Sequence, residues 1–103
     1  MKIQRVLVLV FMCLSSVLAS SALEKGANFY KQKLRTVCLF SGNVMAQKHT
    51  QHEWQVFFEA GRLSEEIQKL CPQSSRLNEA ELRPLYEFLY EFANDSGNTA
   101  KCY

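Results

Sequence analysis

The sequence predicts a small all-α domain that follows a cleaved N-terminal signal peptide. Three observations predict it. A chain of 103 residues holds at most one small domain, an apolar run near the N-terminus is followed by small residues, and the four apolar segments after it all have helical spacing. Only residues 86–92 alternate as a strand would, and no second such run exists to pair with their backbone. We therefore expect about four short helices within residues 23–103.

Residues 1–22 are expected to be the signal peptide. Basic residues precede an apolar run at 6–14, and small residues follow at 15–22, which is the order of segments in a secretory leader. The apolar run is well short of the roughly 20 residues that cross a bilayer, so a retained membrane anchor is the weaker interpretation. Cleavage fits after Ala19 or Ala22, and we expect an exported protein with no membrane insertion after cleavage.

The charge balance argues against nucleic acid as a partner. The chain has 12 Lys and Arg residues and 10 Asp and Glu residues, and two of the basic residues, Lys2 and Arg5, belong to the leader. The mature chain is therefore neutral, whereas a nucleic-acid-binding domain needs a basic surface to neutralise phosphates. We expect no nucleic-acid binding.

The first helix is expected to end at the Ser41-Gly42 pair, which is a stop signal. Its apolar residues lie at i, i+4, i+7 and i+8 and form one stripe. They are Tyr30, Leu34, Val37 and Cys38. The lysine and arginine residues of this segment point elsewhere.

The second helix is expected to begin at Thr50 and to end at Gly61. The Thr50 hydroxyl can accept a hydrogen bond from the backbone three residues on, and Glu53 can return the bond, which is a capping box. Gly61 supplies the left-handed residue that ends a helix. Aromatic residues at i, i+3 and i+4 form the apolar face and should make much of the core. They are Trp54, Phe57 and Phe58.

A third helix, of barely two turns, is expected between Ser64 and Pro72. Ser64 is a suitable N-cap, Glu65 and Glu66 follow it near the positive end of the helix dipole, and Pro72 stops the helix. Its apolar positions are Ile67, Leu70 and Cys71.

The fourth helix is expected to begin at the N-cap Asn78, with Glu81 at the third position, and to end before Gly97. Pro84 complicates it, because a proline six residues inside would clash with the carbonyl of Ala80. The helix should either kink or start there. Its apolar face is formed by Leu82, Leu85, Tyr86, Leu89, Phe92 and Ala93.

Export changes the interpretation of the cysteines. Cys38, Cys71 and Cys102 remain after cleavage, in a compartment where disulfides persist, and so small a domain gains little from its core alone. An up-and-down helix order brings the ends of the first and third helices together, which makes Cys38–Cys71 the first choice of bridge. In the loop-entropy model it stabilises the fold by roughly 3–4 kcal/mol. Cys102 could compete for either partner, stay free, attach a cofactor or join a second copy as a dimer.

Two histidines offer the only candidate polar site. His49 and His52 stand beside Glu53 and superficially resemble a metal-ligand pair, but zinc needs three or four ligands and only Cys38 or Met45 is near. Nucleophilic catalysis would need Cys38 with one of the histidines, and nothing local supports that pair. We expect neither a metal site nor an enzyme. The numerous aromatic residues are expected to fill the core rather than to wall a cofactor.

Several segments, taken in order, resemble a known family. They are Gly26 to Tyr30, Leu34 to Cys38, Ser41-Gly42, Lys48 to Trp54, Leu85 to Ala93, Asp95 to Asn98, and Cys102. Together they resemble the small exported cytochrome-c-like proteins of epsilon-type proteobacteria, over nearly the whole mature chain. The resemblance implies a class I cytochrome c-like helical fold, in which the first and last helices cross, and residence in the periplasm.

The chain departs from this family at the haem-attachment motif. A c-type haem is attached through C-x-x-C-H, whose histidine binds the iron. Only the first cysteine can be carried over, onto Cys38, because Ser41 and Gly42 occupy the places of the second cysteine and of the histidine. Ordinary attachment through two thioethers is therefore excluded. If haem is bound in another way, its candidate ligands are Cys38, Met45, His49 and His52.

Two hypotheses follow from these features. The first is a haem-free, non-enzymatic periplasmic protein that acts as an interaction or accessory module for another exported protein. It is motivated by a complete helical frame without the metal-binding signature. The second is an atypical cytochrome c that binds haem and transfers electrons in a periplasmic respiratory chain. A thiol-redox role is disfavoured because no C-x-x-C is present.

Overall fold

A computed structural model describes residues 23–98, and within them every regular element is a helix. The predicted all-α fold is therefore confirmed. The expected signal peptide, residues 1–22, and Cys102, in the segment 99–103, lie outside the described residues. Residues 23–38 form one continuous helix, with α-helical turns at 23–29, a π-helical stretch η1 (Tyr30–Leu34) and a last turn α2 (Arg35–Cys38).

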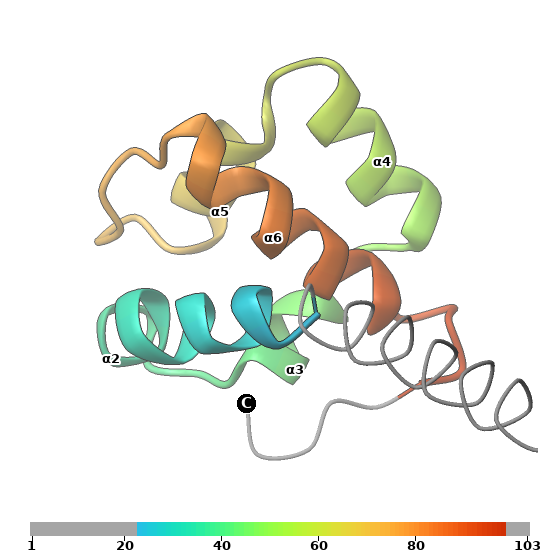
Figure 1. The fold of residues 1–103 in the computed structure, drawn as a ribbon, viewed down its shortest axis with the longest axis horizontal. Coiled ribbons are helices and arrows are strands. Elements are labelled where there is room, and N and C mark those ends of the chain that lie inside the picture. The colour runs from blue at the N-terminus through green and yellow to red at the C-terminus, as the bar shows by residue number, and fades with distance from the viewer. Residues whose placement is uncertain (1–22, 99–103) are drawn as a thin grey trace, which may run out of the picture.

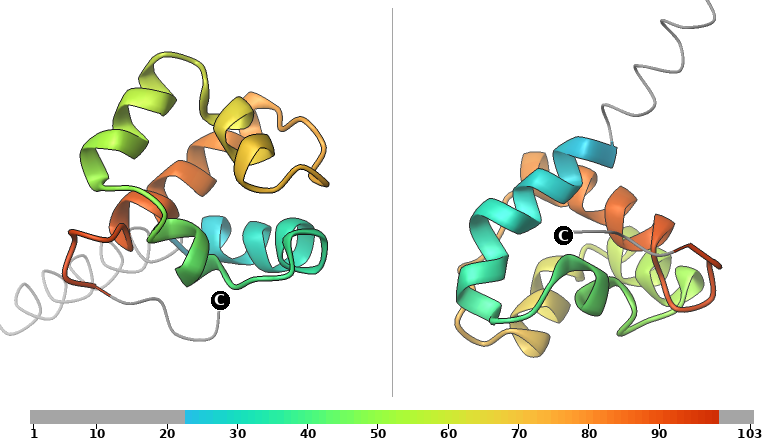
Figure 2. Two further views of the ribbon diagram at one scale, coloured as in Figure 1. Left: turned by 180° about the vertical axis from the view of Figure 1, so that it is seen from behind. Right: turned by 90° about the horizontal axis from the view of Figure 1, so that it is seen from below.

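Four further helices follow along the chain. They are α3 (Gly42–Ala46), α4 (Gln51–Glu59), α5 (Leu63–Leu70) and α6 (Glu79–Glu91). Helix α6 crosses the middle of the molecule, with helix 23–38 on one side and α4 and α5 on the other (Figure 1). Helices α3 and α4 both pack on α6, and the views from behind and from below show the same arrangement (Figure 2).

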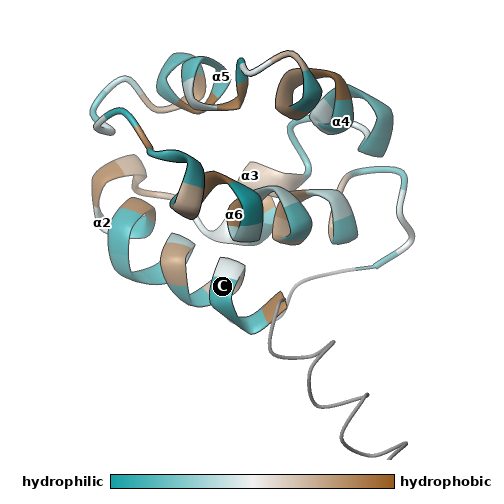
Figure 3. Ribbon diagram, turned by 45° about the horizontal axis from the view of Figure 1, so that its top comes forward, coloured by the Kyte–Doolittle hydropathy of each residue, from teal (hydrophilic) through white to brown (hydrophobic). Residues whose placement is uncertain are grey.

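The core lies around α6 and takes side chains from every helix. Apolar residues appear as separate bands on otherwise polar helices (Figure 3), as expected when each helix buries one face. The largest fully buried side chains are Trp54, Tyr30, Phe88, Leu34, Met45, Leu63, Ile67, Leu85 and Leu89. The expectation for the second helix was only partly right, because Trp54 is fully buried whereas Phe57 and Phe58 lie at the edge of the core, each partly exposed.

Helix 23–38 approaches α6 most closely at Gly26. A Cβ atom placed on Gly26 would lie 2.1 Å from the backbone oxygen of Pro84 and 2.8 Å from Cβ of Phe88. Only glycine lets the two backbones come this close. Pro84 itself lies inside α6, which begins at Glu79 and runs through it, so the helix does not start at the proline.

The sequence at Ser41-Gly42 was wrongly expected only to stop a helix. The first helix already ends at Cys38, where Leu39 adopts a left-handed conformation with φ of 66°. The Ser41 hydroxyl then accepts a hydrogen bond from the backbone N–H of Val44 and caps the unexpected helix α3. A serine followed by glycine can both follow one helix and begin the next.

The expected capping box of α4 and the expected N-cap of α6 are confirmed. The Thr50 side chain accepts from the backbone of Glu53, whose carboxylate accepts from the Thr50 backbone, and Asn78 and Glu81 do the same for α6. Gly61 has the expected positive φ, 71°.

The expected cap of α5 is wrong. The helix begins at Leu63, and Arg62 stands at the N-cap position without a side-chain bond. Ser64 is buried inside the first turn, where its hydroxyl accepts from the backbone N–H of Leu77 at 2.9 Å. Burial of Leu63 in the core places the start of the helix one residue before the expected cap.

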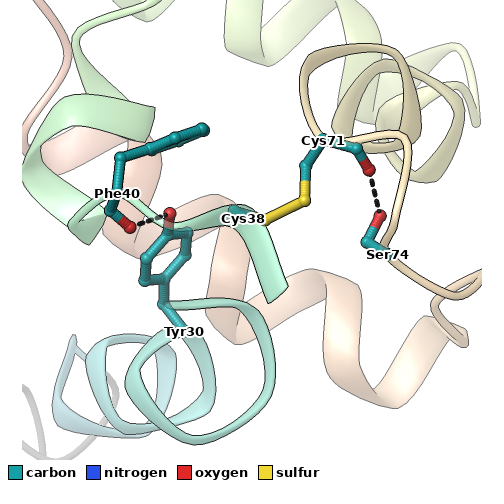
Figure 4. Close-up of a disulfide and its surroundings, with 5 residues drawn as sticks. All are labelled: Tyr30, Cys38, Phe40, Cys71 and Ser74. Atoms are coloured by element: carbon teal, nitrogen blue, oxygen red, sulfur yellow. Dashed lines mark hydrogen bonds between the residues drawn. A yellow bond between two sulfur atoms is a disulfide. The ribbon is translucent and has the colours of Figure 1, made fainter. Parts of the chain in front are cut away.

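The disulfide joins Cys38 to Cys71, as the helix order predicts. It connects the end of α2 to the end of α5, whose C-cap residue is Cys71 (Figure 4). Beside it, the Tyr30 hydroxyl donates to the backbone oxygen of Phe40 at 2.8 Å, and the Ser74 hydroxyl donates to the backbone oxygen of Cys71 at 2.9 Å. The corner that follows helix 23–38 is thus fixed by a covalent bond and by a side-chain hydrogen bond.

Candidate functional site

The strongest polar cluster of the described residues surrounds His49, just before the N-terminus of α4. Its Nε2 atom lies 2.6 Å from Oε2 of Glu66, on α5, and its Nδ1 atom lies 3.6 Å from Oε1 of Glu53, on α4. The side chains of His49 and Glu66 are only 18% and 10% exposed, whereas that of Glu53 is half exposed. A partly buried imidazole therefore stands between two carboxylates.

Aromatic rings fix the plane of the imidazole. The His49 ring meets Trp54 edge-on at 4.8 Å between ring centroids and Phe57 at 5.0 Å. The Trp54 indole N–H donates to the backbone oxygen of Ala46 at 2.8 Å, which holds the tryptophan against the chain that leads to His49. The backbone oxygen of His49 accepts from the N–H of Asn94, beyond α6, at 3.1 Å. Both the ring and the main chain of this residue are thus anchored.

Groups at and just beyond the end of α6 hold the start of α4. The backbone N–H of Gln51 donates to the Asp95 carboxylate at 2.9 Å, and the Gln51 side-chain amide donates to the backbone oxygen of Tyr90 at 3.1 Å. The backbone N–H of Thr50 donates to the Glu53 carboxylate and lowers the pKa of that carboxyl below its usual value. Glu53 therefore stays an anion at neutral pH beside His49.

A charged hollow opens next to this cluster. It has a volume of about 340 Å³ and is lined by Phe57, Arg62, Glu65, Glu66 and Lys69. Glu66 belongs to both features, since it lines the hollow and holds His49. At the rim, Arg62 and Glu65 form an exposed ion pair with 3.8 Å between nitrogen and oxygen.

The arrangement can hold a proton but offers no nucleophile. The two ring nitrogens face different carboxylates, and the 2.6 Å contact to Glu66 is a short hydrogen bond, whereas the 3.6 Å separation from Glu53 is too long for one. A histidine oriented by a carboxylate activates a nearby thiol or hydroxyl in covalent catalysis. Both cysteines of the described residues are joined in the disulfide, and the polar groups that face the His49 ring are the carboxylates of Glu66 and Glu53.

The candidate haem ligands proposed from the sequence are scattered over different environments. Cys38 is bonded to Cys71. Met45 is fully buried in the core. His49 is held by Glu66, and His52 lies exposed in the first turn of α4. Cys102, the third disulfide candidate, lies outside the described residues.

Glu66 is the site residue that sequence reasoning missed. The sequence places it only as a charge near the positive end of the helix dipole, but it is buried and pairs with His49. A signal for it exists. Leu63, Ile67 and Leu70 form one apolar stripe at helical spacing, and Glu66 lies within that stripe. A carboxylate on the buried face of a helix needs a partner.

No family model, curated protein or solved structure matches this chain. Among the described residues, no group of three or more His, Cys, Asp or Glu side chains could hold a metal ion. None of the helices in residues 23–98 is long and apolar enough to span a bilayer.

Proposed function

We propose that the chain is an exported, non-enzymatic accessory module that keeps a cytochrome c-like helical frame without haem and acts by contact with another exported protein. The observation that carries this proposal is the Cys38–Cys71 disulfide. The one cysteine that the family's haem motif assigns to this chain is used to close the fold, so it has no thiol left for a thioether. A disulfide of this kind also persists only in an oxidising compartment, which fits a periplasmic protein.

The packing of the interior supports the same proposal. Met45, Trp54, Tyr30 and Phe88 are all fully buried around α6, so these side chains fill the interior around that helix. His49 would have to leave Glu66, at 2.6 Å, before its Nε2 atom could bind iron. Breaking such a partly buried pair leaves an unpaired carboxylate, which is costly.

The proposal is tested on the full chain, expressed with its leader and purified from the periplasm. We expect a mature chain that begins near Leu23. Its mass should be lower than that of the reduced chain by the two hydrogens of one disulfide. We also expect a colourless protein, with no Soret band before or after addition of haemin and dithionite. His49→Ala and His52→Ala serve as matched variants for any haem that is detected.

The opposite result is equally definite. Red material with a Soret band that disappears in His49→Ala or His52→Ala would make the chain a haem-binding electron carrier. Porphyrin that stays on the polypeptide after acid–acetone extraction would also show that Cys38 carries a thioether. Either outcome contradicts the accessory-module proposal.

A further inference from the structure

The charges of the described residues are segregated along the chain. After Glu24, every charged side chain up to residue 52 is basic, whereas acidic residues outnumber basic ones from 53 to 98. The basic residues are Lys25, Lys31, Lys33, Arg35 and Lys48. All of them are exposed, and none forms an ion pair with another of the described residues. Residues 25–52 thus form a basic stretch of the chain.

Leu39 stands at the end of this basic helix in an unusual state. Its φ is 66°, the left-handed region that favours glycine, and its side chain is 86% exposed. A leucine in this conformation has backbone strain that a glycine would not have. Its side chain buries almost no apolar surface within the fold. Strained residues of this kind cluster at sites that hold ligands.

The structure holds Leu39 rigidly. The preceding residue, Cys38, is bonded to Cys71, and the backbone oxygen of the following residue, Phe40, accepts from the buried hydroxyl of Tyr30 (Figure 4). The Leu39 N–H donates to the backbone oxygen of Arg35 at 2.9 Å. Because the main chain is already fixed here, little backbone entropy is lost when a partner covers the leucine.

Basic groups flank the leucine. A shallow hollow of about 360 Å³ is lined by Arg35, Thr36, Leu39, Phe40 and Ser41. The Lys48 ammonium lies 5.4 Å from the centre of the Phe40 ring. On the helix, Lys31 lies one turn before Arg35. We name these five residues, Lys31, Arg35, Leu39, Phe40 and Lys48, the Leu39 surface.

We propose that the Leu39 surface docks an acidic segment of another exported protein, with an apolar side chain of that segment packed on Leu39. The inference rests on the proposed accessory function and names the surface and the chemistry of its partner. Charge complementarity selects an acidic partner, because the surface carries three cations and no described carboxylate pairs with them. The exposed, rigid leucine supplies the apolar anchor that charge alone lacks.

An anionic lipid surface suits these observations less well. Helices that bind membranes lay a broad apolar face into the bilayer. The apolar residues of helix 23–38 instead pack inward, with Tyr30 and Leu34 buried and Gly26 against α6. What remains outside is one fixed leucine among cations, which fits a pocket in a partner protein better than a flat interface.

The proposal is tested by selecting a random-peptide display library against the oxidised, periplasm-purified chain. We expect the selected peptides to be rich in Asp and Glu around an apolar residue. Leu39→Gly should weaken their binding about tenfold or more, while its thermal stability stays equal to wild type or rises, since glycine relieves the left-handed strain. The double variant Lys31→Glu, Arg35→Glu should weaken binding as strongly and reduce its salt dependence.

Matched control variants distinguish binding at this surface from non-specific binding. Val56 lies within the regular helix α4 and is 47% exposed, so Val56→Ala should leave peptide binding within about twofold of wild type. Arg76→Glu changes an exposed arginine of the acidic part of the chain and should have the same small effect.

Four outcomes would overturn the proposal. They are a selection without acidic peptides, peptides that bind Leu39→Gly as well as wild type, binding to phosphatidylglycerol vesicles in place of peptides, and self-association in sedimentation that Leu39→Gly abolishes. The accessory function would survive peptides that bind elsewhere on the chain. A haem spectrum would remove the accessory function without any peptide experiment, so the two failures are distinguishable.

Discussion

The two ends of helix 23–38 are attached to the rest of the molecule by different means. Near its N-terminal end, Gly26 contacts the backbone of Pro84 in α6, and the attachment depends on the absence of a side chain. At its C-terminal end, Cys38 is bonded to Cys71, and the attachment depends on oxidation. One contact is set by shape and persists in any compartment, whereas the other exists only where thiols are oxidised.

Because of this difference, only one end of the helix depends on oxidising conditions for its attachment. The Gly26 contact joins the helix to α6, the element that also carries α3 and α4. The disulfide joins the helix to α5 and fixes the corner at Leu39. Reduction should therefore loosen the Leu39 surface and the end of α5, while the crossing of helix 23–38 with α6 remains.

Removal of the disulfide should have the largest effect on stability. The bonded cysteines are 33 residues apart, and the loop-entropy model gives a loss of about 3–4 kcal/mol in the free energy of unfolding for Cys38→Ala with Cys71→Ala. Urea denaturation followed by circular dichroism measures it. Cys102→Ser is the control and should leave the midpoint unchanged. A wild-type midpoint that does not move with dithiothreitol would contradict the prediction.

A methyl group at Gly26 should have the next largest effect. It should destabilise the fold, whereas replacing glycine by alanine within a helix normally stabilises it. Alanine normally stabilises an exposed helix position by about 1 kcal/mol relative to glycine. At Gly26 its Cβ would meet the Pro84 oxygen at 2.1 Å, so we expect Gly26→Ala to lower the free energy of unfolding by about 1–3 kcal/mol. Asn28→Ala, on the exposed side of the same helix, should raise it slightly. Equal gains in both variants would exclude close packing at Gly26.

The helices were predictable from the sequence to the extent that their signals are local. The capping boxes at Thr50 and Asn78 and the left-handed Gly61 each depend on residues within one turn, and all are present. Helix α3 was missed because its cap, Ser41, carries the same sequence signal as a stop. The fit of Gly26 against Pro84 is a contact between distant segments, and glycine at that position has no local signature.

The candidate site was predictable only in part, for the same reason. His49 was singled out, but its closest partner, Glu66, is 17 residues away and belongs to another helix. The sequence interpretation used Glu65 and Glu66 only as charges near the helix dipole, although Glu66 lies on the apolar face of that helix and is buried there. The Cys38–Cys71 pair could be proposed because two helix ends and the three cysteines of residues 23–103 leave few choices.

The smallest expected effect concerns the hydrogen bond that supports the oxidised end. Tyr30→Phe removes the donor to the Phe40 oxygen at 2.8 Å and should lower the free energy of unfolding by about 0.5–1.5 kcal/mol at neutral pH. Burial also raises the pKa of Tyr30. A raised pKa in the folded state means that stability is full below the ordinary tyrosine pKa of about 10 and falls as the pH rises above it.

The loss of stability at alkaline pH therefore distinguishes the contribution of the Tyr30 hydroxyl from that of its ring. Wild type should lose stability above about pH 10, and Tyr30→Phe should lose less, because phenylalanine cannot ionise. Tyr86, stacked on Phe58 with 4.2 Å between ring centroids, is the control. Burial raises its pKa as well, but its side chain remains partly exposed, so Tyr86→Phe should flatten the alkaline loss to a smaller degree. Parallel curves for wild type and Tyr30→Phe would mean that the buried hydroxyl does not hold the corner that the disulfide closes.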